Sequence, residues 1–167
     1  NRLMVNDSTY GVDLNRNYGF QWGIDDQGSS PEPTYETYRG LAPFSEPETR
    51  MVRDFCEAHD FVFTQNYHTK GNLLIYPWAY NATLADSSLW YFARLFTREN
   101  QYKTGITFET VGYAVNGSAE DWMHAERGIS SFTPEVGRGG FWPMPDEIDG
   151  YNKANLWQNW TTALCAL

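Results

Sequence analysis

Apolar residues recur at helical spacing in several parts of the chain. One such run follows Ser45-Glu46-Pro47-Glu48, which offers an N-cap serine, an early proline and a capping-box glutamate. We therefore expect a helix over residues 46–59. The same spacing predicts a helix over residues 88–100, and residues 118–126 and 147–166 read as a shorter helix and a closing helix.

Short runs of β-branched and aromatic residues lie between these helices. They predict strands over residues 61–67, 73–76 and 129–133. Strands that alternate with helices indicate an α/β fold with a largely buried sheet, whose ligands gather beyond the carboxyl ends of the strands. His68 and Glu135 both fall at such ends.

The chain reads as one domain without internal repeats. Its 167 residues, of which 41% are apolar, are enough to bury a core, and residues 25–33 are dense enough in turn formers to predict an irregular loop. A net charge of -9 argues against nucleic-acid binding, because a phosphate backbone requires clustered Lys and Arg. No apolar run approaches the roughly 18 residues of a membrane span, so we expect no membrane partner.

Asn15 and Arg16 follow a short apolar run and suit a carboxylate ligand. The planar guanidinium matches a carboxylate through two parallel hydrogen bonds, and a neighbouring amide adds another bond to the same anion. The alternative is that Arg16 pairs with a carboxylate of the protein itself, such as Asp13.

The histidines show no local metal-binding pattern. His59, His68 and His124 do not form a His-x-x-Glu or His-x-x-x-His pair, and a single histidine by itself reads as a hydrogen-bonded structural residue. Asp121 and His124 lie three residues apart on a predicted helix and read as an ordinary surface pair.

Glu135 follows an apolar segment that would deliver its carboxylate to the end of a buried strand. A buried carboxylate without a partner is costly. Glu135 is therefore either paired structurally or tuned for proton transfer.

Together these segments resemble the zinc carboxypeptidases of the carboxypeptidase A and B type, in chain order and over nearly the whole chain. Gly11-Val12-Asp13-Leu14-Asn15-Arg16-Asn17 is similar to the family's carboxylate-binding segment. His68, followed by Leu73-Leu74-Ile75-Tyr76-Pro77, is similar to its third zinc ligand and next strand. Tyr113, Asp121-Trp122 and Ser131-Phe132-Thr133-Pro134-Glu135 keep the family's spacing between the substrate-capping tyrosine, the Asp-Trp pair and the catalytic glutamate.

The resemblance implies a mixed, largely buried β-sheet flanked by helices and a metallocarboxypeptidase that removes C-terminal amino acids from peptides. Asn15 and Arg16 would hold the free C-terminal carboxylate of the substrate, and Tyr113 would close over it. Glu135 would be the catalytic carboxylate, and His68 would bind Zn²⁺.

Glu120 corresponds by count to a position on the floor of the family's side-chain pocket, where an acid accompanies a preference for basic C-terminal residues. We therefore expect substrates that end in Lys or Arg. The alternative is that Glu120 faces solvent on its short helix.

The resemblance also implies what residues 1–167 lack. The family's His-x-x-Glu pair, and another arginine that polarises the scissile carbonyl, would lie before Asn1, so the chain corresponds to the C-terminal portion of one catalytic domain. The N-terminal half would then be a partner, as a separate chain. The alternative is a non-catalytic fragment or pseudo-peptidase that binds C-terminal carboxylates without cutting.

Two further expectations concern compartment and redox state. Members of this family are usually secreted or periplasmic, so the resemblance implies a secreted or periplasmic protein. Cys56 and Cys165 are the two cysteines of the chain, too few for a disulfide framework, and the sequence leaves open whether they pair.

Overall fold

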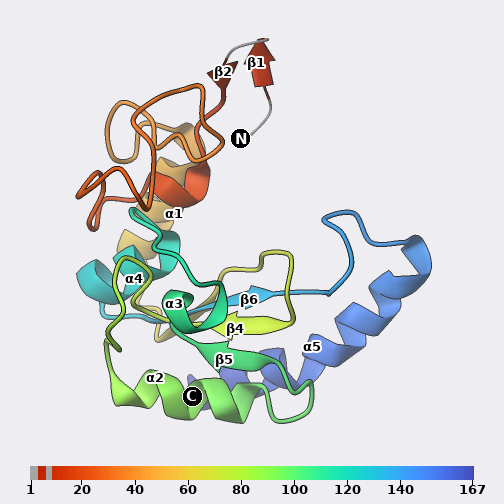
Figure 1. Cartoon of the computed structure of the whole chain (residues 1–167). Coiled ribbons are helices and arrows are strands. Elements are labelled where there is room, and N and C mark those ends of the chain that lie inside the picture. Colours follow the sequence, from red (N-terminus) through yellow and green to blue (C-terminus); the bar gives the residue numbers. More distant parts are fainter. Residues whose placement is uncertain (1–3, 7–8) are drawn as a thin grey trace.

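A computed structural model describes residues 4–6 and 9–167, which form a four-stranded sheet with helices on both faces, and a separate two-stranded ribbon near the N-terminus (Figure 1). The elements in chain order are β1 (Met4–Asn6), β2 (Thr9–Tyr10), a 3-10 helix (Leu14–Arg16), α1 (Pro47–Glu57), β3 (Phe63–Gln65), β4 (Leu73–Ile75), α2 (Ser87–Phe96), β5 (Lys103–Gly105), α3 (Thr107–Thr110), α4 (Ala119–Arg127), β6 (Ser130–Glu135) and α5 (Pro145–Cys165).

The main sheet has the strand order β3-β6-β4-β5. β3 runs parallel to β6, β4 runs antiparallel to β6, and β5 runs parallel to β4. The sheet is therefore mixed, and the predicted α/β class is confirmed. β6 lies inside the sheet, whereas β3 is an edge strand within the part of the chain that the structure describes.

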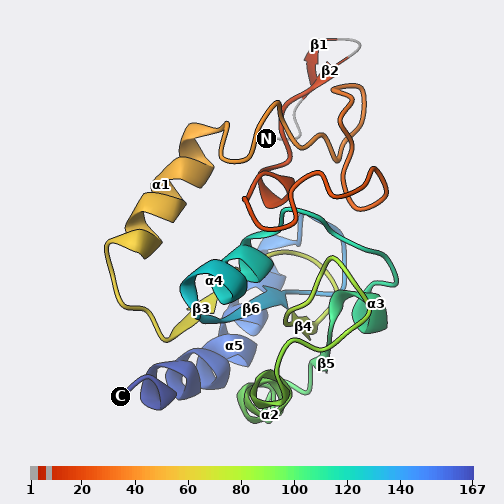
Figure 2. The same cartoon turned by 90° about the vertical axis from the view of Figure 1, so that its left-hand side faces the viewer.

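Side chains of β6 alternate between two cores, as the period of a strand requires. Phe132 is fully buried against α2, where its ring lies 5.3 Å from that of Phe96. Ser131 points the other way, and its hydroxyl lies 3.7 Å from the sulfur of Met123 on α4. Figures 1 and 2 show the same layers, with α2 and α5 on one side of the sheet and α4 on the other.

All four predicted helices and all three predicted strands are present, with shifted ends. The capping box expected at Ser45 is wrong, because α1 begins at Pro47 with Glu46 as its N-cap residue. The Ser45 hydroxyl is used elsewhere: it accepts a hydrogen bond of 2.9 Å from Asn17 and donates one of 2.8 Å to Glu46. β5 and α3 were not predicted, since elements this short carry no readable period.

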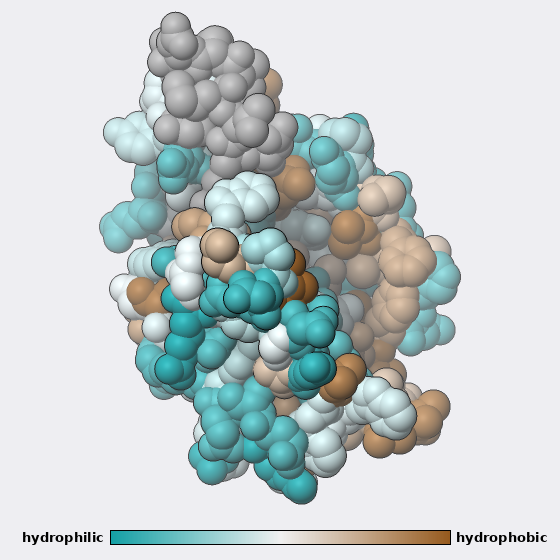
Figure 3. All heavy atoms as spheres, turned by 90° about the vertical axis from the view of Figure 1, so that its right-hand side faces the viewer, coloured by the Kyte–Doolittle hydropathy of each residue, from teal (hydrophilic) through white to brown (hydrophobic). Residues whose placement is uncertain are grey.

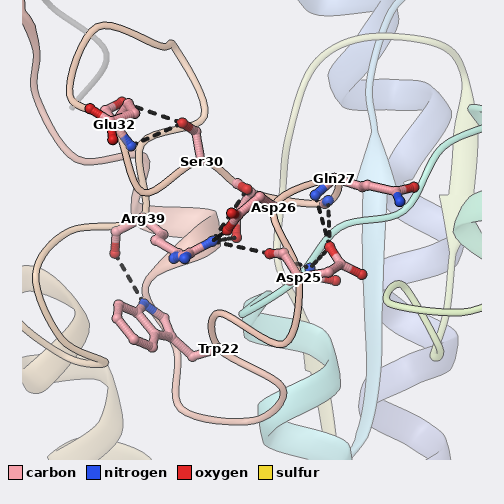
Figure 4. A network of polar contacts seen from close by, with 10 residues as sticks. Trp22, Asp25, Asp26, Gln27, Ser30, Glu32 and Arg39 are labelled. Carbon is pink, nitrogen blue, oxygen red and sulfur yellow. Dashed lines mark hydrogen bonds and ion pairs between the residues drawn. The ribbon is translucent and has the colours of Figure 1, made fainter.

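Residues 25–33 form no helix or strand longer than an isolated bridge between Ser30 and Tyr38, so the predicted irregular loop is confirmed. Its polar groups are well satisfied (Figure 4). Arg39 donates to the backbone oxygen of Asp25 at 3.0 Å and to the carboxylate of Asp26 at 2.8 Å. The Gly28 N–H, which donates to the Asp25 carboxylate, is the main cause that lowers the pKa of Asp25.

The sequence leaves open whether the two cysteines pair. Cys56 and Cys165 are both free thiols and do not pair. Among the helices of the described residues, none is long and apolar enough to cross a membrane.

Candidate active site

One small cavity brings together every site residue that the sequence analysis selected. It has a volume of about 100 Å³, and it lies where the 3-10 helix, α3, α4 and the ends of β4 and β6 meet. Its lining residues are Asp13, Asn15, Arg16, His68, Ile75, Thr107, Val111, Tyr113, Val115, Glu120, Thr133 and Glu135. The selected residues come from well-separated segments, so the fold and not the local sequence places them together.

The 3-10 helix holds Asn15 and Arg16 in position. The Asp13 side chain caps this helix by accepting from the Asn15 N–H at 3.2 Å. The side-chain oxygen of Asn15 accepts from the Ala119 N–H at 2.9 Å, which orients its amide and leaves the NH₂ group without a hydrogen bond to any described residue. That NH₂ group is therefore available as a donor.

Arg16 is 6% exposed and has some of its hydrogen bonds made by the protein. Its Nη1 donates to the Asn15 carbonyl at 3.0 Å and lies 3.7 Å from Asp13 Oδ2. The alternative reading from the sequence, an ion pair with Asp13, is thus present in the fold. The pairing is incomplete, because the buried Nε of Arg16 has no partner among the described residues. Donor capacity remains for an anionic ligand.

His68 and Glu135 lie side by side at the end of the sheet. His68 sits just beyond β3, and its N–H donates to the Pro134 carbonyl at 2.8 Å, while the Val136 N–H donates back to the His68 carbonyl at 2.9 Å. These backbone bonds extend the β3–β6 pairing and bring His68 Nδ1 to 3.8 Å from Glu135 Oε1. The Glu135 side chain is 16% exposed, so its carboxylate lies at the cavity wall rather than in open solvent.

Tyr113 is on the loop between α3 and α4, lines the cavity and is 55% exposed. The loop is anchored after Tyr113, where the Val115 N–H donates to the Ala79 carbonyl at 2.9 Å and the Asn116 N–H to the Gly28 carbonyl at 3.3 Å. These bonds hold the residues after Tyr113 against the segments of Ala79 and Gly28.

Glu120 and Asp121 occupy the first turn of α4, and both are buried. Glu120 is 3% exposed and lines the cavity, so the alternative that it faces solvent is wrong. The surface pair expected between Asp121 and His124 is also wrong. Asp121 is 1% exposed and accepts from the N–H groups of Ala79 at 2.9 Å and Tyr80 at 3.2 Å. The burial of Asp121 could not be predicted from the sequence, because its backbone partners are distant in the chain and no residue pattern near Asp121 indicates them.

Comparison with known proteins bears on the whole chain. The family model described as zinc carboxypeptidase matches residues 1–158. The chain belongs to the zinc carboxypeptidase family.

Two carboxypeptidases B are among the relatives. The protein from Helicoverpa zea is 29% identical over 157 residues, which are 83% of this chain and 36% of the relative, and the protein from Astacus astacus is 32% identical over 139 residues, which are 75% of this chain and 44% of the relative. The chain therefore spans less than half the length of these zinc carboxypeptidase relatives.

Solved structures show the same fold. Bovine thrombin-activatable fibrinolysis inhibitor, in complex with tick carboxypeptidase inhibitor, superimposes with a TM-score of 0.87 at 24% identity over 98% of this chain and 60% of that one. The carboxypeptidase A from Helicoverpa armigera gives a TM-score of 0.83 at 26% identity over 99% of this chain and 45% of that one. The described residues thus form part of a zinc carboxypeptidase fold.

Zinc is implied by the family, and the residues of this chain fit it only in part. Catalytic zinc sites in proteins use three protein ligands, commonly histidine and glutamate. Among the described residues no group of three or more His, Cys, Asp or Glu side chains is placed to hold a metal ion. His68 is the one histidine of the cavity lining, so a zinc site here requires ligands from elsewhere.

The cavity also contains residues that the sequence analysis did not select, notably Thr107 and Thr133, and the apolar Ile75, Val111 and Val115. Thr133 could have been predicted, because it lies two residues before Glu135 on the same strand and its side chain therefore lies on the same face of the sheet. Thr107 could not, because it belongs to a helix of 4 residues that carries no motif.

The burial of Asp121 generates a stability prediction. Asp121→Asn is expected to destabilise the chain by about 1–3 kcal/mol, because the amide has one oxygen where the carboxyl group, protonated or ionised, has two facing the Ala79 and Tyr80 N–H groups. Urea unfolding measures this change. Asp60→Asn, at an exposed position, is the matched control and should leave the midpoint unchanged.

The stability difference between wild type and Asp121→Asn is expected to depend on pH. Burial, followed by the charge of Glu120, raises the pKa of Asp121 well above 3.8. The stability from this group is present below pH 3.8 and is lost as pH rises through the folded-state pKa. Asp121→Asn abolishes the titration, so the stability difference between wild type and variant should narrow as pH increases. A difference that widens with pH would contradict the assignment.

Proposed function

We propose that this chain is the C-terminal portion of a metallocarboxypeptidase catalytic domain, and that the intact domain removes C-terminal amino acids from peptides. The observation that carries the proposal is the cavity, around which Asn15, Arg16, His68, Tyr113 and Glu135 converge from separate elements. The donors of Asn15 and Arg16 are left available, and a carboxylate stands beside a histidine.

Exopeptidase action follows from the chemistry of the donors. Arg16 and the oriented amide of Asn15 suit a planar anion, and a free C-terminal carboxylate is the anion that every peptide end supplies. Binding that group fixes the last peptide bond relative to the rest of the cavity. Tyr113 closes over the bound residue, and Glu135 moves a proton during hydrolysis.

Zinc enters this proposal through His68 alone. In the intact domain His68 is one metal ligand, and the others come from a His-x-x-Glu pair in the N-terminal portion, where a second arginine also lies. One imidazole is too few ligands for a catalytic zinc site, so residues 1–167 alone are not expected to carry out metal-assisted hydrolysis. The alternative function is a non-catalytic module that binds C-terminal carboxylates, and it is favoured by the lack of a three-ligand group among the described residues.

The edge of β3 is where we place the N-terminal portion, as a partner chain or a preceding segment. The Val62 carbonyl and the N–H groups of Asn66 and His68 bond toward β6, so the intervening residues Phe63, Gln65 and Tyr67 direct their backbone groups to the outer edge. Such an edge pairs readily with another strand. Beside it lies a larger hollow of about 710 Å³, lined in part by Tyr67, His68 and Leu156.

Side-chain preference and compartment complete the proposal. Buried Glu120 places an acid in the cavity, which supports selection of substrates that end in Lys or Arg. A secreted or periplasmic location rests on family membership alone and stays a prediction.

The carboxylate grip is testable on the chain itself. Arg16→Lys keeps the charge but removes the planar fork, so the affinity for benzoylglycine should fall by about 2 kcal/mol, or roughly 30-fold. Isothermal titration calorimetry measures the binding. Arg94→Lys, on the exposed side of α2, is the control and should bind as wild type does. Equal binding of benzoylglycine and its amide would exclude the carboxylate grip.

Metal content separates the intact enzyme from the fragment. We expect residues 1–167 to hold less than one tight zinc per chain and to show no peptidase activity, and a longer version with the preceding coding sequence to hold one zinc and cleave peptides. In the longer version His68→Asn should abolish the zinc, whereas His59→Asn, at an exposed position, should not. Plasma emission spectroscopy after dialysis gives the stoichiometry. One tight zinc on the short chain would overturn this prediction.

The basic preference is tested with the longer version. Peptides ending in Arg or Lys should be cleaved with a higher kcat/KM than peptides ending in Phe, because Glu120 pairs with the side-chain cation. Glu120→Gln should reduce that ratio by about 10-fold or more, since it removes a charge-assisted bond. Rates that are equal, or higher for Phe, would show that Glu120 does not select the substrate.

A further inference from the structure

β5 is the edge strand of the sheet on the side away from β3. Two of its residues direct their backbone groups toward β4. The Lys103 N–H donates to the Asn72 carbonyl at 3.1 Å. The Gly105 carbonyl accepts from the Tyr76 N–H at 3.3 Å. Because the direction of these groups alternates along a strand, the N–H and C=O of Thr104 point outward, and they bond to no described residue. Thr104 can therefore exchange hydrogen bonds with an added strand.

Two hollows lie beside this edge, and Thr104 lines both. One has a volume of about 290 Å³ and is lined in part by Arg98, and the other has a volume of about 220 Å³ and is lined in part by Trp90. Trp90, Arg94 and Arg98 follow at intervals of four residues along α2 and just beyond its end, so one face of this helix forms a wall. The two hollows together are called the α2–β5 groove below.

One end of the α2–β5 groove is basic, although the whole chain has a net charge of -9. The Arg98 guanidinium lies over the Trp157 ring, 4.6 Å from its centroid. Its Nε donates to the exposed Glu99 at 3.0 Å, while its Nη groups bond to no described residue. Arg94, whose guanidinium lies 5.1 Å from the centroid of the Trp90 ring, adds a second positive charge. This end suits a carboxylate.

The other end of the α2–β5 groove is mainly apolar. Its lining includes Tyr76, Leu84, Trp90 and Ile106. Glu109 also lines this end, but its carboxylate accepts from the Ile106 N–H at 3.3 Å and caps α3. The half-exposed indole of Trp90, which is 48% exposed, is a flat apolar surface that another side chain can cover.

The strand order places the two edges of the sheet on opposite sides. β3 lies to the left of β5 in Figure 2 and therefore to its right in Figure 3, which shows the molecule from the opposite side. Hydrophobic side chains gather toward the right of Figure 3, and the lower left of that view is largely hydrophilic. The α2–β5 groove is thus separate from the edge at which we place the N-terminal portion.

We propose that the α2–β5 groove docks an extended segment of a partner protein, which adds to β5 as a strand with an apolar side chain beside Trp90 and an acidic one beside Arg98. Antiparallel pairing is slightly the more stable arrangement, and in it a single partner residue exchanges both bonds with Thr104. This inference does not rest on the proposed function.

Geometry sets the spacing of the two recognised side chains. Eight residues of a helix, the separation of Trp90 and Arg98 along the chain, span about 12 Å. Four residues of a strand span about 13 Å. The apolar and acidic residues of the partner are therefore four positions apart on one face of its strand, with the residue midway between them opposite Thr104. In an antiparallel strand the apolar residue comes first.

The test is an NMR titration of the isotope-labelled chain, in whichever assembly it is isolated, with the peptide acetyl-Phe-Thr-Val-Thr-Asp-amide. Both ends of the peptide are blocked, so it offers no terminal carboxylate to Asn15 and Arg16. We expect the amide resonance of Thr104 to move as peptide is added. Replacing the peptide's Asp by Asn should weaken binding roughly 3-fold to 5-fold, because the ion pair that it removes is exposed.

Backbone pairing is tested on the peptide itself, which avoids any effect on folding. N-methylation of its Val removes the donor to the Thr104 carbonyl and should weaken binding roughly 5-fold. N-methylation of the Thr just before that Val is the matched control. Its N–H points away from β5 in the docked strand, so the affinity should be retained.

Variants of the chain assign the two side-chain contacts. Arg98→Gln should remove most of the difference between the Asp and Asn peptides, and Trp90→Ala should weaken binding of both roughly 10-fold. Arg127→Gln and Tyr91→Ala, at exposed positions outside the α2–β5 groove, are the matched controls and should bind as wild type does.

Three outcomes would overturn the docking site. They are no binding of the peptide, equal binding of its Asp and Asn forms, and resonance shifts at the candidate active site in place of Thr104. Because the peptide has no free terminal carboxylate, none of these outcomes bears on the carboxylate grip.

Discussion

The arrangement of the site depends on β6, which is hydrogen-bonded to a neighbour on each side. β3 pairs with it in parallel and β4 in antiparallel orientation, so its register is fixed from both edges. Phe132 is buried against α2 on one face, and a slip of one residue would turn that ring away from its core. The same constraint fixes Thr133 and Glu135 on the opposite face, where the cavity lies.

Secondary structure with a clear period could be read from the sequence, and structure that depends on distant partners could not. The helix spacing that led to α1 and α2 is local information, and both helices are present with shifted ends. The cap of α1 was mispredicted because Asn17, far along the chain, takes the Ser45 hydroxyl. β5 and α3 exist because they pack on the sheet, and their few residues show no pattern.

Site residues follow the same division. Motif and spacing selected six residues, and the fold brings all of them to one cavity: Asn15, Arg16, His68, Tyr113, Glu120 and Glu135. Thr107 could not be selected, because a threonine without a motif gains meaning only from the three-dimensional cavity around it. Asp121 was predicted to lie on the surface, because nothing in the local sequence shows its hydrogen-bond partners. These are the backbone N–H groups of Ala79 and Tyr80, which lie 42 and 41 residues earlier in the chain.

The buried polar side chains of this site differ in how completely the protein satisfies them with hydrogen bonds. These differences separate side chains that hold the structure together from side chains that face a ligand. Asp121 accepts backbone hydrogen bonds with both oxygens and holds the segment of Ala79, whose carbonyl anchors the Tyr113 loop at Val115. Arg16 makes only some of its possible hydrogen bonds, to the Asn15 carbonyl and beside Asp13. Oε2 of Glu120 has no hydrogen-bond partner among the described residues. A polar group held rigid but left unsatisfied is preorganised for a ligand, since the protein has already restricted it.

Under the proposed function, His68 would link the metal site to the outer edge of the sheet. It lines the small cavity beside Glu135, and it also lines the larger hollow next to the outer edge of β3. A strand that joined that edge would end near the imidazole, because the backbone of β3 leads directly to His68. On the same proposal, a segment that paired with this edge would come within reach of the metal, so one docking event would satisfy the exposed backbone groups and supply the other ligands. Folding and metal binding would then be coupled, as they are wherever ligands are assembled only in the native state.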